Sequence, residues 1–116
     1  MAWKEMNVAP TQEGGSLNLK AFEAKDSLAA AGNGVSILLP DDIKMIMATT
    51  KPTGCETKLQ YTADLVHEVK SGVADWYDAW WLGFWDEDET LPMFPCTAVR
   101  LVQSGAGSSA IRVRAQ

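Results

Sequence analysis

The chain has 116 residues, of which 47% are hydrophobic and 22% charged, a composition typical of one globular domain (residues 1–116) rather than a disordered segment. Its formal net charge of −5 excludes a general nucleic-acid binder, because phosphate contacts require clustered Lys and Arg. No apolar run approaches the roughly 18 residues of a membrane span, and the N-terminus MAWKEMNVAP lacks the apolar core of a signal peptide. We therefore expect no nucleic-acid or membrane partner, and folding in a cytoplasm.

Apolar and polar residues alternate along much of the first half of the chain, which predicts short strands. Residues 16–21 (SLNLKA) and 57–63 (TKLQYTA) alternate clearly. Residues 35–39 and 43–50 are more uniformly apolar, as in central strands whose two faces are both covered. Turns that contain Gly or Pro separate these segments.

One short helix is predicted at residues 64–71, DLVHEVKS. Asp64 can cap its first turn, and Gly72 can end it in the left-handed conformation. His67, the only histidine, lies in this segment beside Glu68. No serine or cysteine nucleophile stands in a recognisable motif nearby, so we interpret His67 as a partly exposed helix residue rather than a catalytic base.

The segment DWYDAWWLGFWDEDE, residues 75–89, holds four of the five tryptophans and ends in four consecutive acids. Its aromatics recur about every four residues, which on a helix would form a continuous stripe. Gly83 disfavours a long helix and aromatic residues favour strands, so we predict a strand, a turn at Leu82-Gly83 and a return strand. Such a hairpin has aromatics on both faces, and the core covers only one of them.

The last two predicted strands are residues 97–102 (TAVRLV) and 109–115 (SAIRVRA), with residues 105–107 as the hairpin turn between them. In the second strand, Arg112 and Arg114 lie opposite three apolar residues. Short strands with turns at this spacing predict an antiparallel sandwich or barrel. We assign the chain to the all-β class, as an antiparallel β-sandwich, jelly-roll-like, with at most one short helix.

The remaining candidate chemistry is sparse. Cys55 and Cys96 are expected to be two free, buried thiols, because a cytoplasm keeps thiols reduced. Two cysteines and one histidine in unrelated contexts do not form a zinc pattern, and the glycine turn near the C-terminus lacks the lysine and the helix of a phosphate loop. Nothing in the sequence assembles a nucleophile, a base and an oxyanion site. We therefore predict a protein that is not an enzyme, with no cofactor and no metal.

Several interpretations of the aromatic and acidic segment stay open. The four acids, residues 86–89, fit a solvated loop, a contact with a basic surface of a neighbouring subunit, or a cation site that lacks the calcium-loop pattern. The tryptophans can stack on sugar rings, as in carbohydrate-binding modules of the same fold class. Asp75 and Asp78 are possible glycosidase carboxylates, but a chain this small has little room for a substrate cleft.

Two segments resemble a broad group of small phage proteins encoded among virion structural genes: KLQYTADLVHEVKSGVADWYDAW and PCTAVRLVQSGAGSSAIRVRAQ, residues 58–80 and 95–116. The group has the patterns QYTxD…V…GxAxWxxW…G and P(V/C)TA(I/V)RL…SG…(I/V)xVRAQ. The matching residues are Gln60, Tyr61, Thr62, Trp76, Trp80, Thr97, Ala98, Arg100 and Leu101. The resemblance covers about half of the chain, which departs from the patterns in its excess of aromatics at residues 81–85 and in the acids that follow.

The resemblance implies a β-sandwich component of a virion, most simply a capsid decoration (cement) protein, with a head-to-tail or tail accessory protein as the nearby option. We interpret the chain as a non-enzymatic homo-oligomer, a trimer, that binds the major capsid protein on the capsid surface after synthesis in the host cytoplasm. The hypothesis from another class is a carbohydrate-binding module for attachment of the virion to host glycans.

Large aromatics act as energetic anchors in interfaces, and the acids beside them and the C-terminal arginines carry opposite charges. These are the candidate contacts with other subunits or the capsid: Trp76, Trp80, Trp81, Phe84, Trp85, Asp86, Glu87, Arg100, Arg112 and Arg114.

Overall fold

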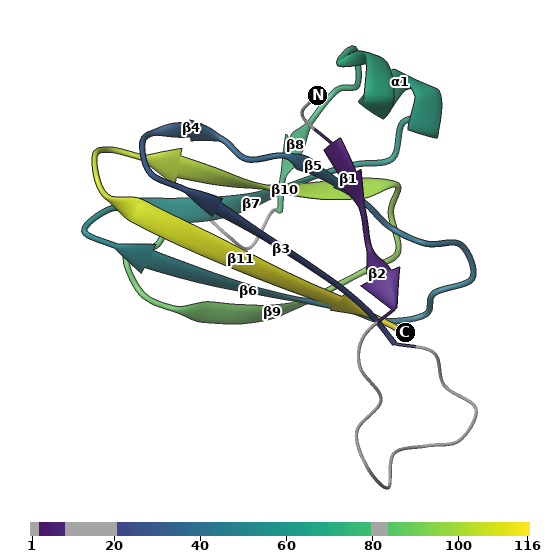
Figure 1. Ribbon diagram of the computed structural model, residues 1–116, viewed down its shortest axis with the longest axis horizontal. Coiled ribbons are helices and arrows are strands. Elements are labelled where there is room, and N and C mark those ends of the chain that lie inside the picture. The colour runs from purple at the N-terminus through teal and green to yellow at the C-terminus, as the bar shows by residue number, and fades with distance from the viewer. Residues whose placement is uncertain (1–2, 9–20, 80–83) are drawn as a thin grey trace, which may run out of the picture.

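The computed structural model describes residues 3–8, 21–79 and 84–116, which form two β-sheets and one short helix (Figure 1). Sheet A contains β1 (Trp3–Glu5), β4 (Gly32–Asn33), β5 (Ser36–Leu38), β7 (Glu56–Thr62), β8 (Tyr77–Asp78) and β10 (Ala98–Ser104). Sheet B contains β2 (Asn7–Val8), β3 (Phe22–Leu28), β6 (Ile46–Thr53), β9 (Glu89–Met93) and β11 (Ser108–Ala115). The predicted all-β sandwich is confirmed.

The strand order is that of a jelly roll. Sheet A runs β1-β5-β10-β7-β8, with β4 also paired to β10, and sheet B runs β2-β3-β11-β6-β9. The pairs β3–β11, β5–β10, β6–β9 and β7–β8 are all antiparallel, as expected when one long hairpin is rolled into two sheets. β1 runs parallel to β5 and continues into β2, so the N-terminal strand edges both sheets.

The core lies between the sheets and follows the alternation of the strands. In β11, Ile111, Val113 and Ala115 are buried and the two arginines between them are exposed, as predicted. The largest apolar side chains of the core are almost fully buried: Ile37, Ile46, Leu59, Val99, Leu101, Ile111 and Val113. Each such burial contributes about 1.5–3 kcal/mol relative to exposure, so the sandwich is a rigid support for its surfaces.

Two strand predictions need correction. Residues 43–50 were expected to be covered on both faces, but β6 begins at Ile46 and turns Thr49 and Lys51 outward. The strand β3 was not predicted, because Asp26 interrupts its apolar face. The Asp26 carboxylate accepts the backbone N–H of Val35 at 2.9 Å, above Gly34, where any Cβ would lie 2.5 Å from the Asp26 Oδ2 atom. The predicted strand at 16–21 falls almost wholly outside the described residues.

The helix α1 (Val66–Ser71) confirms the predicted short helix but begins two residues after the predicted start at residue 64. Its N-cap is Leu65, whose N–H donates to the Glu68 carboxylate at 3.0 Å. The expected cap, Asp64, instead accepts the N–H of Asp75 at 2.7 Å and so ties the two ends of the helical segment together. Gly72 ends the helix with φ of 80°, as predicted, and Val69 packs on the outer face of sheet A.

Residues 105–107 do not form a hairpin turn, because β10 and β11 lie in different sheets. The connection is an arch that crosses the sandwich. The buried side chain of Gln103 fills it: its amide donates to the carbonyls of Gly105 and Gly107 at 3.1 and 2.9 Å. Its carbonyl oxygen accepts the hydroxyl of Ser109 at 2.6 Å.

The predicted hairpin in the aromatic segment is also wrong. Its first strand exists as β8, where Asp78 pairs with Gln60 of β7. Trp85, expected in the return strand, pairs with the same strand, at Thr57, instead of with β8. The pairings Asp78–Gln60 and Trp85–Thr57 do not share one register, since they are offset by four residues along the chain. The turn expected at Leu82-Gly83 lies outside the described residues.

Candidate interaction surfaces

Four exposed aromatic side chains lie along the β8 side of the sandwich: Tyr77, Phe84, Trp85 and Phe94, which are 55%, 39%, 41% and 44% exposed. We call them the aromatic edge. Tyr61 of β7 supports one end, since its ring lies 6.0 Å from that of Tyr77 and 4.9 Å from that of Phe94. The hydrogen bonds between Thr57 and Trp85, both 2.8 Å, hold the other end on β7. Contacts with β7 therefore hold both ends of the aromatic edge in place.

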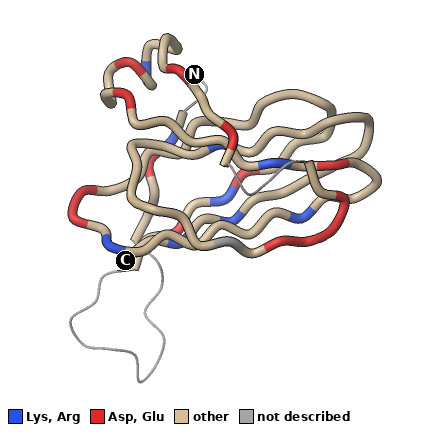
Figure 2. Tube along the Cα trace, turned by 180° about the vertical axis from the view of Figure 1, so that it is seen from behind, with Lys and Arg blue, Asp and Glu red and all other residues tan. Residues whose placement is uncertain are grey.

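The acidic run, residues 86–89, follows the aromatic edge directly. It leads from Trp85 at the margin of sheet A to Glu89, which pairs with Thr50 in sheet B, so it crosses the side of the sandwich (the red stretch at lower right in Figure 2). Asp86, Glu87 and Asp88 are exposed. The ion pairs found among the described residues include none of these carboxylates.

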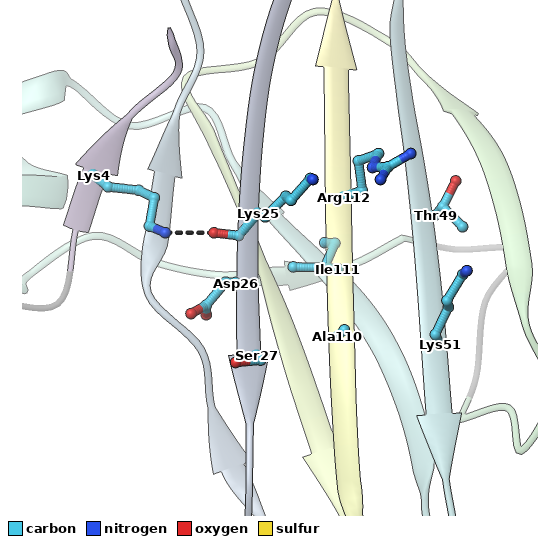
Figure 3. Close-up of a pocket in the computed structure, with 9 residues that line it drawn as sticks. All are labelled: Lys4, Lys25, Asp26, Ser27, Thr49, Lys51, Ala110, Ile111 and Arg112. Carbon is cyan, nitrogen blue, oxygen red and sulfur yellow. Dashed lines mark hydrogen bonds between the residues drawn. The ribbon is translucent and has the colours of Figure 1, made fainter.

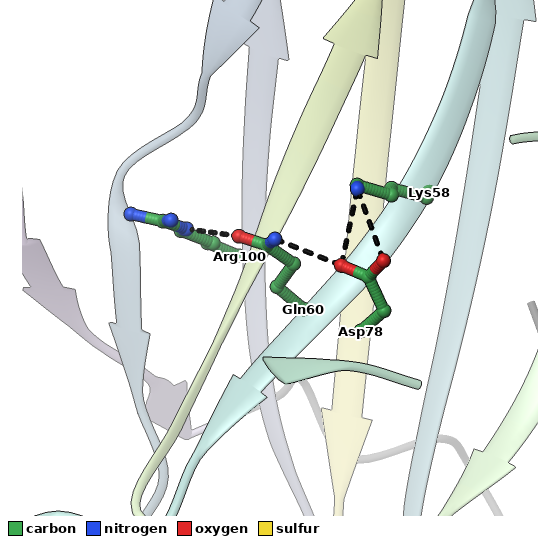
Figure 4. A network of polar contacts seen from close by, with 4 residues as sticks. All are labelled: Lys58, Gln60, Asp78 and Arg100. Carbon is green, nitrogen blue, oxygen red and sulfur yellow. Dashed lines mark hydrogen bonds and ion pairs between the residues drawn. The ribbon is translucent and has the colours of Figure 1, made fainter. Parts of the chain in front are cut away.

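The outer face of sheet A carries a row of paired polar groups (Figure 4). The Arg100 guanidinium donates to the Gln60 amide oxygen at 2.8 Å, and the Gln60 amide nitrogen donates to Asp78 at 2.9 Å. Lys58 completes the row with an ion pair to Asp78 at 3.1 Å. The hydrogen bond from Gln60, followed by that from Lys58, lowers the pKa of Asp78, whereas burial lowers the pKa of Arg100.

Trp76 belongs to this same face and serves the fold. Its ring is half-buried against a small apolar cluster that includes Leu38, Val69 and Ala98. The Arg100 guanidinium covers it at 4.3 Å from the ring centroid. Trp80 and Trp81, the other tryptophans proposed as contacts, lie outside the described residues.

Arg112 and Arg114 lie on the outer face of sheet B, away from Arg100. Both pair with Glu23 of β3, at 3.3 and 3.5 Å, and both side chains are about half exposed. The three C-terminal arginines therefore do not form one surface. Lys25 and Lys51, which sequence reasoning missed, flank Arg112 on the same face (Figure 3).

The other candidate residues do not converge. His67 is exposed on α1. Cys55 and Cys96 are free and half-buried instead of buried, and burial raises the pKa of Cys96 to about 12. In the part of the chain that the structure describes, no group of three or more His, Cys, Asp or Glu side chains is placed to hold a metal ion. Among the described residues, no helix has the length and apolar character needed to cross a membrane.

Comparison with known proteins gives no relative: no family model matches the chain, and no curated protein matches it.

Proposed function

We propose that this chain is a non-enzymatic structural protein of a virion, a capsid decoration protein that binds the major capsid protein on the outer surface of the shell. It does so as a homo-oligomer, with a trimer as the proposed state. The observation that carries the proposal is the aromatic edge: Tyr77, Phe84, Trp85 and Phe94 stay exposed although the fold has a complete core elsewhere. Large apolar side chains left exposed on one side of a fold are a mark of an interaction site.

The physical requirements of a decoration protein fit these features. Such a protein needs a stiff scaffold, a surface that binds other subunits, and no reaction centre. The jelly roll supplies the scaffold, and the sequence resemblance to phage virion proteins supports the setting. Aromatic side chains that become buried in a contact bury on the order of 150–250 Å² each, which is why a few of them can dominate binding. The same surfaces would serve a head-to-tail or tail accessory protein.

Glycan binding is the second candidate, and one observation favours it. The row Lys58–Asp78–Gln60–Arg100 places donors and acceptors beside the exposed ring of Phe84, a combination that suits sugar hydroxyls. The cations of this row make it less suitable for sugar binding, because they cover the aromatic faces on which a sugar ring would stack. Lys58 lies 4.6 Å above the Phe84 ring, and Arg100 covers Trp76, so one face of each ring is already occupied.

Replacing Trp85 by Ala tests the proposal. Trp85 is exposed and, as an anchor, its loss should weaken oligomer or capsid binding by roughly 2 kcal/mol, or about thirtyfold, while the melting temperature changes little. Cosedimentation with capsids assembled from the major capsid protein of the same virus measures the binding, and light scattering measures the oligomer.

Trp76→Ala is the matched control, because it removes the same side chain from the covered face of sheet A. It should lower the melting temperature and leave assembly of the folded fraction unchanged. Glycan binding would be favoured instead by two results together. The wild-type chain would stay monomeric, fail to bind capsids and bind a glycan array, and the Trp85→Ala variant would lose that glycan binding.

A further inference from the structure

Four cations gather around one open depression at the outer face of sheet B: Lys25, Lys51 and Arg112 from that sheet, and Lys4, which reaches the Lys25 carbonyl from β1 of sheet A. We call them the basic face. β3, β11 and β6 lie side by side there, so residues distant in sequence become neighbours (Figure 3). Asp26 also lines the depression, but its carboxylate is bonded to the Val35 N–H. The basic face thus has a strong excess of positive charge in a chain of net charge −5.

The register makes this clustering costly. Arg112 lies directly opposite Lys25 on the outward side of the sheet. Like charges in such cross-strand positions destabilise a sheet, and Glu23, which pairs with Arg112, is shared with Arg114. The ion pairs of the described residues include neither Lys25 nor Lys51. The fold therefore tolerates a charge arrangement that it does not itself neutralise.

The complementary charge is present on the same chain. The acidic run ends at Glu89, which pairs with Thr50 beside Lys51, yet the ion pairs of the described residues include none of its carboxylates. The acidic run lies at the side of the sandwich, where the chain passes from the margin of sheet A into β9. The basic face points out of sheet B. Two surfaces of opposite charge, one at the side and one on a face, can meet between two copies of the chain.

We propose that the acidic run of one copy binds the basic face of the next, in a side-to-face contact. The inference rests on the proposed homo-oligomer and names its two surfaces. A contact between different surfaces is heterologous, and its rotation can close into a ring such as a trimer. Phe84 and Trp85 adjoin the acidic run, so they enter the contact and meet the aliphatic stems of the lysines. The charges fix the register, and the aromatics are the anchors.

Charge reversal of each surface, and then of both in one chain, tests the contact. The first variant carries Lys25→Glu and Lys51→Glu, the second carries Asp86→Lys and Asp88→Lys, and the third carries all four changes. All four side chains are exposed, and Lys25→Glu places a carboxylate opposite Arg112, so the variants are expected to fold. Sedimentation velocity over a concentration series measures self-association, and circular dichroism with thermal melting checks folding.

Each single-surface variant should self-associate roughly tenfold or more weakly than wild type, because like charges then meet in the contact. The four-change variant should recover to within about threefold, because opposite charges face each other again. Lys44→Glu, an exposed change outside both surfaces, is the control and should leave association close to wild type. Higher salt should weaken the wild-type contact as well.

Three results would overturn the inference. One is a folded four-change variant that fails to recover. Another is a Lys25→Glu, Lys51→Glu variant that assembles normally but no longer cosediments with capsids, since the basic face would then bind the capsid and the proposed function would stand. The third is a wild-type chain that stays monomeric at all accessible concentrations. If that monomer also ignores capsids, the proposed function fails with it.

Discussion

The outer faces of the two sheets both carry cations, but in different environments. On the outer face of sheet A, Lys58 and Arg100 have partners: both lie over aromatic rings and join the row through Asp78 and Gln60. At the other end of that face α1 packs down, and Lys70 lies 4.4 Å above the Trp3 ring. On sheet B, Lys25 faces Arg112 and is absent from the ion pairs of the described residues.

We infer from this difference that the cations of sheet A stabilise the fold and that those of sheet B are available to a partner. A cation that stacks on a ring and donates to a fixed acceptor contributes to the stability of the single chain. Lys25, which lies opposite Arg112 and enters no ion pair among the described residues, would gain a counter-charge on assembly. Substitutions on sheet A should therefore change the melting temperature, and substitutions on sheet B should change association.

The largest effect expected on sheet A is that of Trp76→Ala. The ring fills the space between Ala98 and the Arg100 guanidinium, and removing it leaves a partly open cavity. Since the ring is only half-buried, we expect a loss of about 2–3 kcal/mol in the free energy of unfolding, below the range for a fully buried Trp. Urea denaturation followed by circular dichroism measures it. A loss under about 1 kcal/mol would show that this cluster contributes little.

A smaller contrast is expected between two arginines, one on each sheet. Arg100→Ala removes a half-buried guanidinium that is bonded to Gln60 and should cost about 1–2 kcal/mol of unfolding free energy. Arg112→Ala removes a half-exposed side chain from a like-charge pair and should stay within about 0.5 kcal/mol of wild type. Equal losses in parallel urea titrations would contradict the distinction between the two faces.

The smallest expected effect is a pH dependence at Asp78. The folded state lowers the pKa of Asp78 through Gln60 and Lys58, so the stabilisation is present above the unfolded pKa of about 3.9 and is lost as the pH falls through the folded value. Because the carboxylate is half exposed, the effect is small. Asp78→Asn should be slightly less stable than wild type at pH 6, and the gap should close near pH 3. A gap that widens on acidification would reverse the predicted sign.

The fold was largely predictable because alternation with period two is a local property of each strand. It revealed β11 and most of β7 directly. The inward carboxylate of Asp26 hid β3, since its role depends on Gly34, eight positions away in the sequence. The arch after β10 resembled a hairpin turn in the sequence. Whether two successive strands lie in one sheet or in two depends on tertiary packing, which the local sequence does not show.

The candidate surfaces were only partly predictable. Composition identified the exposed Phe84 and Trp85 and the acidic run beside them. It could not show that Trp76 packs into the fold, because that depends on Arg100, 24 positions later in the sequence, covering the ring. Nor could it place Lys25 beside Arg112, since only the strand order β3-β11-β6 brings them together. The alternation of buried and exposed residues along β6 was a local indication that Lys51 points outward.

Electron cryomicroscopy of capsids incubated with the wild-type protein tests the central claim most directly. The account predicts added density at fixed positions on the shell, with copies grouped about a local symmetry axis. In that density Phe84, Trp85 and the acidic run should lie inside contacts, while the Lys58–Asp78–Gln60–Arg100 row stays internal to each copy. Bare capsids, or bound copies whose aromatic edge faces solvent, would contradict it.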